Sequence, residues 1–322
     1  MDRYESRADT VVVALGGNAI LQAGQRGTAA EQMANVRTTA FEIASLVAAG
    51  WRVVVTHGNG PQVGNILLQN EEAQHTVPPM PLDVCGAESQ GMLGYMIAQA
   101  LGSALAARGI PRPVAAIITQ VVVDPLDPAF SSPTKPVGAF YSDEQAERLK
   151  SERGWTMKKT DKGWRRVVAS PDPLAIVEAA AIEQLVDAGV VVVASGGGGV
   201  PVVVHDGTLV GVEGVIDKDL AGQRLAADVR AGYFLILTDV PRVKLFYGQP
   251  NEKELERLTV SEARAYLEEG HFGVGSMAPK IKAAIRFLEA GGREAVIAAL
   301  GAGIAALEGR AGTRIVPDES NG

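Results

Sequence analysis

The most constraining feature of this sequence is a pattern that occurs three times, in which a short valine-rich run ends in a cluster of glycines. Apolar β-branched runs of this length are typical of strands buried on both faces of a parallel sheet. Glycines at the carboxyl ends of such strands expose backbone N–H groups where open α/β sheets bind anionic ligands. The pattern therefore predicts a sheet edge that binds a phosphorylated compound. The runs are residues 11–15, 53–56 and 190–194, and the clusters are 16–18, 57–61 and 195–199.

Segments with helical spacing alternate with apolar runs along almost the entire sequence. Thr259-Val260-Ser261-Glu262 has the form of a capping box, and Asp172-Pro173 has the form of a cap and first helical turn. Such alternation predicts an α/β fold with helices on both faces of a mainly parallel sheet. We expect helices over 31–49, from 61, and over 86–108, 175–188, 259–270 and 276–289, and further strands over 113–119, 233–238, 295–300 and 313–316.

Residues 124–170 interrupt this alternation, because they combine several prolines and many charges with two of the three tryptophans, Trp155 and Trp164. The segment is too long for an ordinary loop in a compact domain. It predicts a small protruding subdomain that acts as a lid over the carboxyl edge of the sheet. A softer boundary lies near Gly211, where the sequence is equally compatible with two lobes and with one sheet shared by both parts.

Composition excludes several classes of protein. A net charge of −7 provides no basic surface of the kind that nucleic-acid-binding proteins carry. The single cysteine, Cys85, cannot form a disulfide within the chain. The first ten residues lack the apolar core of a signal peptide, and no apolar stretch approaches the length of a membrane span. We therefore expect a cytoplasmic enzyme that binds neither nucleic acid nor membranes.

Most familiar catalytic motifs are absent from the sequence. It contains no Gly-x-Ser-x-Gly elbow, no Cys-x-x-Cys pair and no Gly-x-x-x-x-Gly-Lys-Ser/Thr loop, and no Gly-x-Gly-x-x-Gly follows the first strand. The four histidines lie too far apart to suggest a local metal site. Glycine backbone and lysine remain, and this combination suits phosphoryl transfer, in which a protein mainly positions the reactants and neutralises charge.

Three lysines are candidates for that role. Lys280 follows a glycine loop into a helix, where its ammonium can meet a phosphate near the positive end of the helix; a solvated helix lysine is an equally good interpretation. Lys218 lies between Asp217 and Asp219, a pattern that also fits a simple capped helix start. Lys135 lies in the proline-rich segment, where a surface lysine is the simpler interpretation.

Other candidates follow predicted strands. Asn18 and Asn59 follow glycines, where asparagine is usually a turn residue. His57 fits either a substrate contact or packing at the strand end, and packing is slightly favoured. Residues 238–240 follow a strand at the usual place for a nucleotide-contacting loop, and Tyr247 offers an aromatic face for a purine, although a lone tyrosine is more often part of a core.

Taken in order, several motifs resemble those of the carbamate kinases, which belong to the amino acid kinase family. The resemblance runs from about residue 10 to 317 without large gaps. The motifs are Ala14-Leu15-Gly16-Gly17-Asn18-Ala19, His57-Gly58-Asn59-Gly60-Pro61-Gln62-Val63-Gly64, Asp124-Pro125, Asp127-Pro128-Ala129-Phe130, Pro133-Thr134-Lys135-Pro136-Val137-Gly138, Arg165-Arg166-Val167-Val168, Ser170-Pro171, Val215-Ile216-Asp217-Lys218-Asp219, Gly275-Ser276-Met277 and Pro279-Lys280.

The resemblance implies an open αβα sandwich over residues 9–317, with the protruding subdomain at 124–170. Residues 9–211 would mainly bind carbamate and phosphate, and residues 212–317 mainly the nucleotide. The implied activity is reversible phosphoryl exchange between carbamate and ATP or ADP, with Mg²⁺ as cofactor, by a homodimer. It would usually run from carbamoyl phosphate and ADP towards ATP, at the end of arginine deiminase or related degradation routes.

The resemblance also assigns roles to individual residues, each carried over by motif. Lys218 and Lys280 would neutralise the transferring phosphoryl group, Asp219 would hold these lysines, and Lys135 would reach in from the protrusion. Carbamate and phosphate would be bound by Gly16, Gly17, Asn18, His57, Gly58, Asn59, Gly60, Ser195, Gly196 and Gly197. The nucleotide would be surrounded by Thr238, Asp239, Val240, Tyr247, Gly275, Ser276 and Met277.

One departure from the wider family concerns the first glycine pair, which most amino acid kinases precede with a lysine. This chain has Ala14-Leu15 there, an absence that carbamate kinases share, and Lys218 is the implied substitute. Two other hypotheses remain open. A relative acting on an acid such as glutamate would need a cation near the glycine loops, and neither loop contains one. A nucleotide-binding regulator without turnover would not need Lys218, Lys280 and Asp219.

Overall fold

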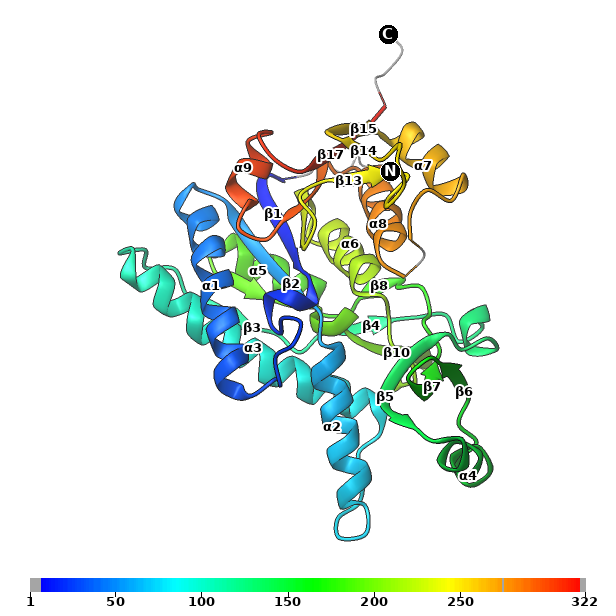
Figure 1. The fold of residues 1–322 in the computed structure, drawn as a ribbon. Coiled ribbons are helices and arrows are strands. Elements are labelled where there is room, and N and C mark those ends of the chain that lie inside the picture. The colour runs from blue at the N-terminus through cyan, green and yellow to red at the C-terminus, as the bar shows by residue number, and fades with distance from the viewer. Residues whose placement is uncertain (1–6, 274, 319–322) are drawn as a thin grey trace.

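The three valine-rich runs lie side by side in one sheet. In the computed structural model, which describes residues 7–273 and 275–318, they form β1 (Arg7–Leu15), β2 (Arg52–His57) and β9 (Val191–Val193) (Figure 1). The strands are parallel, with Leu15 opposite His57 and Val55 opposite Val193. Their carboxyl ends, and the glycine clusters that follow, therefore meet at one edge of the sheet.

These strands belong to an eight-stranded sheet in the order β15-β17-β16-β12-β1-β2-β9-β3. Neighbouring strands are parallel except for β16 and β17. Strands from both sides of residue 211 contribute, so both parts of the chain share one continuous sheet, and the predicted α/β class with a mainly parallel sheet is confirmed. The other strands are β3 (Val114–Ala116), β12 (Ala231–Thr238), β15 (Arg257–Thr259), β16 (Glu294–Ala299) and β17 (Thr313–Val316).

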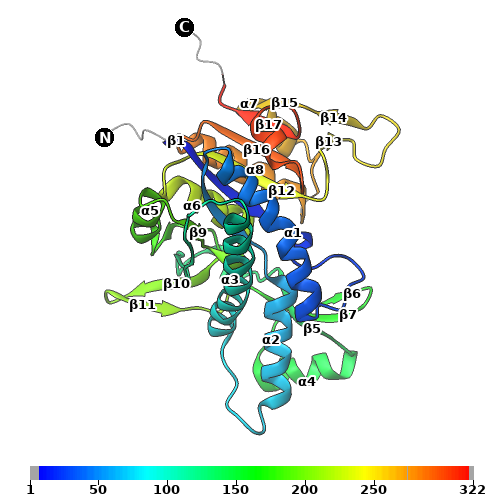
Figure 2. The same ribbon diagram turned by 90° about the vertical axis from the view of Figure 1, so that its left-hand side faces the viewer.

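Helices cover both faces of this sheet, as Figures 1 and 2 show from two sides. Alternate side chains of β1 explain why, because Val11, Val13 and Leu15 pack into one core cluster and Val12 and Ala14 into another. The first cluster includes residues of α1 (Ala29–Ala48), α3 (Leu82–Ala107) and α9 (Gly303–Leu307). The second includes residues of α5 (Ala179–Asp187), α6 (Lys218–Asp228), α7 (Val260–Glu268) and α8 (Met277–Glu289).

The proline-rich segment contains a small antiparallel sheet in the order β5-β7-β6, with α4 beside it (Figure 1). The elements are β5 (Lys135–Tyr141), α4 (Asp143–Arg153), β6 (Met157–Thr160) and β7 (Gly163–Val168). Val137 and Val168 of this sheet pack against Val63 and Leu67 of α2 (Gly60–Ala73). The protruding sheet is therefore fixed on α2 and lies beside the glycine-bearing edge of the main sheet.

A second sheet and a hairpin complete the fold. The sheet has the order β11-β10-β4-β8, built from β4 (Gln120–Val122), β8 (Ala175–Ile176), β10 (Val200–His205) and β11 (Thr208–Gly211). The hairpin pairs β13 (Val243–Leu245) with β14 (Lys253–Leu255), and short 3-10 helices cover Gly17–Ala19, Pro128–Phe130 and Gly196–Gly198. No helix among the described residues is both long enough and apolar enough to cross a membrane.

Three predicted elements are wrong in their bounds. The helix predicted over 86–108 begins earlier, at Leu82, with Pro81 as its N-cap. The helix predicted over 175–188 starts only at Ala179, because Ala175 and Ile176 pair with β4 as β8, and Asp172 forms an ion pair with Arg286 instead of capping a helix. The strand predicted over 113–119 ends at Ala116, because the chain leaves the main sheet there to enter the second one. The last two changes are not visible in local sequence, since both depend on the second sheet.

Candidate active site

The first two glycine clusters lie in direct contact at the edge of the main sheet. Gly16 N–H donates to the Leu237 carbonyl (2.9 Å), and Gly58 N–H donates to the Leu15 carbonyl (3.2 Å). A Cβ atom at Gly58 would lie 3.3 Å from Lys218 Cδ and 3.9 Å from Gly17 Cα. The stem of Lys218 therefore runs along the glycine backbone at a distance that leaves little room for a side chain.

The third glycine cluster packs against two side chains of the second one. A Cβ atom at Gly196 would lie 2.5 Å from His57 Nε2, and a Cβ atom at Gly197 would lie 2.1 Å from Asn59 Nδ2. Asn59 also donates to Ser89 Oγ (2.7 Å). These glycines are thus required by packing against His57 and Asn59, a reason that differs from the exposed N–H groups expected from the sequence.

Two helix starts bring a carboxylate between two lysines. The Asp219 carboxylate accepts hydrogen bonds from Lys218 Nζ at Oδ1 (2.7 Å) and from Lys280 Nζ at Oδ2 (2.9 Å). Lys218 and Asp219 open α6, whereas Lys280 lies in the first turn of α8. The side chains of Asp219, Lys280 and Lys218 are 4%, 10% and 23% exposed, so this cluster, here called the Lys–Asp–Lys cluster, is largely shielded from water.

Burial and charge act in opposite directions in the cluster. Burial lowers the pKa of the Lys218 ammonium below its ordinary value, and the Asp219 carboxylate offsets only part of that shift. Burial alone would raise the pKa of Asp219, but Lys218 and Lys280 outweigh it and hold that pKa below its ordinary value. The cluster places two lysines around one carboxylate, an excess of one formal positive charge that favours a bound anion.

His57, the first residue of the second glycine cluster, is buried. It is 2% exposed, its Nδ1 lies 2.9 Å from the Gly58 carbonyl oxygen, and burial lowers the pKa of its imidazole to about 4. The ring is therefore neutral near pH 7 and packs against Gly196, so the geometry supports the packing interpretation more than a direct substrate contact.

A second lysine–aspartate contact links the protruding sheet to α6. Lys135 Nζ, at the first residue of β5, donates to Asp217 Oδ2 (3.0 Å). Asp217 is also the N-cap of α6, because its Oδ1 accepts the backbone N–H of Asp219 (2.9 Å). Lys135, which was expected to reach in from the protrusion, therefore contacts the residue that directly precedes Lys218 in the sequence.

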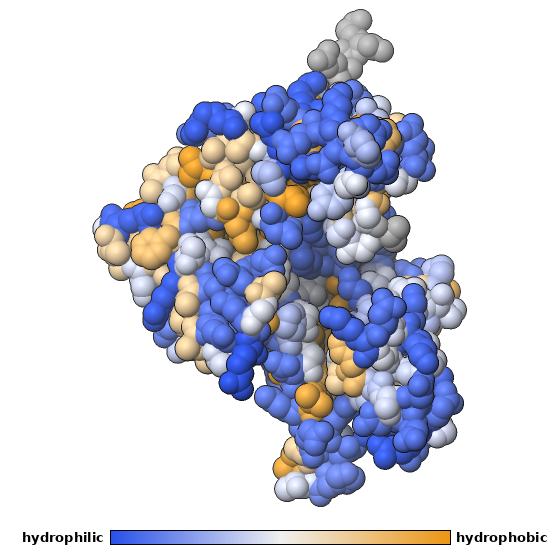
Figure 3. Space-filling model, in the orientation of Figure 1, coloured by the Kyte–Doolittle hydropathy of each residue, from blue (hydrophilic) through white to orange (hydrophobic). Residues whose placement is uncertain are grey.

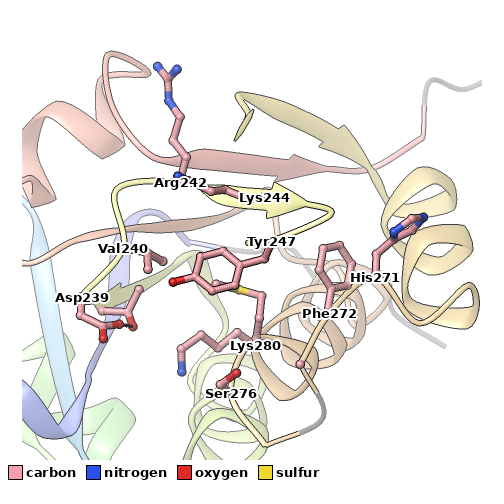
Figure 4. A pocket seen from close by; sticks show the side chains of 12 residues that line it. Asp239, Val240, Arg242, Lys244, Tyr247, His271, Phe272, Ser276 and Lys280 are labelled. Atoms are coloured by element: carbon pink, nitrogen blue, oxygen red, sulfur yellow. Dashed lines mark hydrogen bonds between the residues drawn. The ribbon is translucent and has the colours of Figure 1, made fainter. Parts of the chain in front are cut away.

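A pocket of about 260 Å³ opens beside Lys280, and Figure 4 shows Tyr247 and Lys280 reaching into it from different elements. It lies between the end of β12, the β13–β14 hairpin and the start of α8. The predicted nucleotide residues Thr238, Asp239, Val240, Tyr247, Ser276 and Met277 line it, together with Arg242, Lys244, His271, Phe272, Gly273 and Lys280. In Figure 3 the surface is hollowed between the part of the molecule that carries β13, α7 and α8 and the protruding sheet.

The pocket also contains residues that the sequence motifs do not single out. Phe272 directly precedes the glycine loop of α8, which is a signal that could have identified it. Arg242 and Lys244 line the pocket and form ion pairs with Glu256 and Glu252, and the Arg242 side chain extends away from the pocket in Figure 4. Nothing in the local sequence indicates which side of the hairpin they occupy.

Other predicted residues lie at the margins of the site. Gly17 and Asn18 are exposed, and Gly60 is exposed at the start of α2. Gly275 is exposed and is not among the residues that line the pocket beside Lys280. Ser195 is fully buried in a left-handed conformation (φ 54°), and its Oγ has no hydrogen-bond partner. Its side chain therefore does not reach the surface that the first two glycine clusters form.

The site contains few metal ligands. In the described ranges 7–273 and 275–318, no three His, Cys, Asp or Glu side chains are grouped so that they could hold a metal ion. Asp239, at the end of β12, supplies an exposed carboxylate to the pocket. This donor set fits Mg²⁺ that arrives with a nucleotide, since Mg²⁺ in such sites is held by phosphates, waters and one or two carboxylates.

Comparisons with known proteins identify the family of this chain. The family model for the amino acid kinase family matches residues 9–299. Carbamate kinases of Pyrococcus furiosus and Thermococcus kodakarensis are each 56% identical over 310 residues, which cover 95% of this chain and 99% and 98% of those proteins. The structure of a carbamate kinase from Giardia lamblia bound to AMP-PNP matches with a TM-score of 0.93 and 45% identity, covering 97% of this chain and 99% of that one. The chain thus belongs to the amino acid kinase family, and within it to the carbamate kinases.

Proposed function

We propose that this protein catalyses reversible phosphoryl transfer between carbamate and the magnesium complex of ATP, mainly from carbamoyl phosphate and ADP towards ATP. One observation carries the proposal. Lys280 lines the nucleotide-side pocket and shares Asp219 with Lys218, whose stem packs on Gly58 of the second glycine cluster. The pocket and the glycine clusters therefore meet at two lysine ammonium groups, where a phosphoryl group could pass from one side to the other.

The reaction needs no proton transfer. A β-phosphate oxygen of ADP attacks the phosphorus of carbamoyl phosphate, the bond from phosphorus to the carbamate oxygen breaks, and carbamate leaves as an anion. Lys218 and Lys280 neutralise the charge that spreads over the phosphoryl oxygens between the two partners. The burial of His57 as a neutral ring agrees with a mechanism that has no general base.

The surrounding residues position the two substrates. The Gly16 and Gly58 N–H groups donate to backbone carbonyls, so the N–H groups of Gly17 and Gly60 would face carbamate and the transferring phosphate, with Asn18 at the rim. Tyr247 and Met277 would contact the adenine nucleotide, and Asp239 would lie near its phosphates and magnesium. Mg²⁺ supplies charge neutralisation on those phosphates when it is bound with the nucleotide. Residues 124–170 would act as a lid that brings Lys135 to the phosphate.

A homodimer is part of the proposal. Val84, Met92 and Tyr95 lie eight and three residues apart along α3 and are 37%, 37% and 62% exposed, so they form an apolar stripe on one side of the helix. Such a stripe supports association with a second copy. A cytoplasmic location stays a prediction from composition, and a place in arginine or carbamoyl phosphate breakdown stays a prediction that rests on the resemblance.

The test is ATP formation from MgADP with three donors: carbamoyl phosphate, acetyl phosphate and glutamyl phosphate. Rapid turnover with carbamoyl phosphate, and at least a hundredfold slower turnover with the others, is the expected result. Preference for another donor would point to a different small acid. A folded protein that binds nucleotide but turns over none of the three would favour the regulator hypothesis.

A further inference from the structure

We propose that Asp217 is a positioning residue that holds Lys135 of the protruding sheet at the phosphoryl-transfer site. The inference rests on the proposed function and extends it to a residue outside the Lys–Asp–Lys cluster. Asp217 would act through Lys135, without contacting the substrate itself.

The two oxygens of Asp217 have different partners. Oδ1 accepts the backbone N–H groups of Asp219 (2.9 Å) and Leu220 (3.5 Å), which caps α6 and fixes the start of the helix that carries Lys218. Oδ2 accepts from Lys135 Nζ (3.0 Å). One carboxylate therefore ties the amino end of α6 to the first residue of the protruding sheet.

The backbone brings the two residues together from distant parts of the chain. Lys135 pairs with Val168 across β5 and β7, and the residue after Val168, Ala169, forms a parallel bridge with Gly214. Val215 N–H donates to the Ala169 carbonyl (2.9 Å), two residues before Asp217. The base of the protruding sheet is thus bound to the segment that leads into α6, and the ion pair is the side-chain contact at that junction.

The balance of charge supports a role for the ion pair in the position of Lys135. Together, Lys135, Lys218 and Lys280 carry three positive charges, and Asp217 and Asp219 carry two negative ones. Without Asp217, the remaining carboxylate, Asp219, already accepts from Lys218 and Lys280, so Lys135 would lose its ion pair and hydration would favour its moving into water. The Lys135 side chain is 36% exposed, more than Lys218 or Lys280, so it is the one expected to move.

A lysine that is already in place needs less ordering when the substrate phosphate binds. Loss of Asp217 should therefore weaken the binding of carbamoyl phosphate and leave the nucleotide pocket unchanged. This effect should vanish when Lys135 has been removed, because Asp217 acts through that side chain.

The experiment measures KM for carbamoyl phosphate and for ADP in the full-length protein and in Lys135→Met, Asp217→Asn and the double variant. Asparagine is as good an N-cap as aspartate, so the helix cap is kept while the charge is removed. We expect carbamoyl phosphate KM to rise about tenfold in Lys135→Met and about three- to tenfold in Asp217→Asn, as for loss of one charge-assisted contact in a partly exposed site. ADP KM should change less than about twofold, and the double variant should match Lys135→Met because the two residues act as a unit.

Glu213→Gln is the matched control, because Glu213 joins the same segment to the protruding sheet through Arg166 (2.6 Å) but lies outside the site. Glu213→Gln should leave both KM values within about twofold of those of the unmodified protein, as expected for a residue that makes no substrate contact. Asp217→Ser, which also keeps the cap, repeats the test if Asp217→Asn is poorly folded, and thermal unfolding of each variant identifies such a case.

An unchanged or lowered carbamoyl phosphate KM in a folded Asp217→Asn protein would overturn the inference. So would effects of Asp217→Asn and Lys135→Met that multiply in the double variant. These results differ from failure of the proposed function, in which the unmodified protein itself would form no ATP from carbamoyl phosphate.

Discussion

Two lysine–aspartate contacts lie at the start of α6 but differ in their surroundings. In the Lys–Asp–Lys cluster, Asp219 is 4% exposed and lies between two helix starts that pack on the main sheet. In the Lys135–Asp217 pair, the lysine is 36% exposed and belongs to a small sheet that extends from the body of the molecule (Figure 2). A buried, rigid charge acts on the transition state without rearranging, whereas an exposed one must first be ordered. We therefore expect the cluster to govern kcat and the pair to govern KM.

The largest effect should come from Lys280→Met, which removes the ammonium group and keeps the apolar stem. We expect kcat to fall about 10²- to 10³-fold, as in the loss of one fixed contact to transition-state charge. Lys282→Met is the control, because Lys282 lies two residues further along α8 and is 45% exposed. If the fall in kcat were accompanied by a large fall in the unfolding temperature, loss of folding would explain it. The lysine would then be structural, and the contrast between the two contacts would fail.

Asp219→Asn should lower stability as well as turnover, because it leaves two largely buried lysines without a carboxylate. Breaking a buried ion pair by removing one partner costs about 3–5 kcal/mol in the free energy of unfolding. Urea unfolding of Asp219→Asn and of Asp217→Asn compares the buried carboxylate with the more exposed one. Equal losses of stability in the two variants would show that burial does not distinguish the contacts.

His57 should make stability fall in acid. Its pKa is about 4 in the folded protein and 6.5 ordinarily, so between these values the unfolded chain binds more protons and stability decreases as pH falls. The full shift corresponds to about 3 kcal/mol. Urea unfolding from pH 7 to 4 should show a shallower decline in His57→Gln than in the unmodified protein, with the exposed His205→Gln as control. Identical declines in all three would place His57 in contact with water.

The smallest effect is expected at Cys85. The thiol is buried, and burial together with Glu88 and Asp83 raises its pKa to about 11. Little thiolate therefore forms near neutral pH, and thiol reagents should leave ATP formation unchanged in the folded protein. Rapid inactivation, abolished in Cys85→Ser, would reveal an opening motion of α3 that the structure does not contain.

Much of the fold follows from local sequence, because its signals are short-range. The valine runs predict the central strands, and the capping box at Thr259–Glu262 predicts α7, where both of its hydrogen bonds are present. The helix predicted over 175–188 fails because Ala175 and Ile176 join a sheet whose partner strand lies more than fifty residues earlier. Strand pairing at that distance leaves no periodic signal in either segment.

The candidate site likewise combines residues that local sequence identifies with contacts that it does not. A glycine loop entering a helix points to Lys280, and Asp217 and Asp219 flank Lys218 in sequence, so these residues can be named without a structure. The pairing of Lys135 with Asp217 could not be named, because it joins residues 82 positions apart through the register of β5 and β7. The orientations of Arg242 and Lys244 likewise depend on how the β13–β14 hairpin packs over the pocket.

The most direct test of the account is a crystal structure with MgADP, carbamate and a fluoroaluminate that mimics the transferring phosphoryl group. We predict the fluoroaluminate within hydrogen-bond distance of both Lys218 Nζ and Lys280 Nζ, between the glycine clusters and the pocket that holds ADP. A fluoroaluminate bound away from these lysines, with both ammonium groups still engaged only by Asp219, would contradict it.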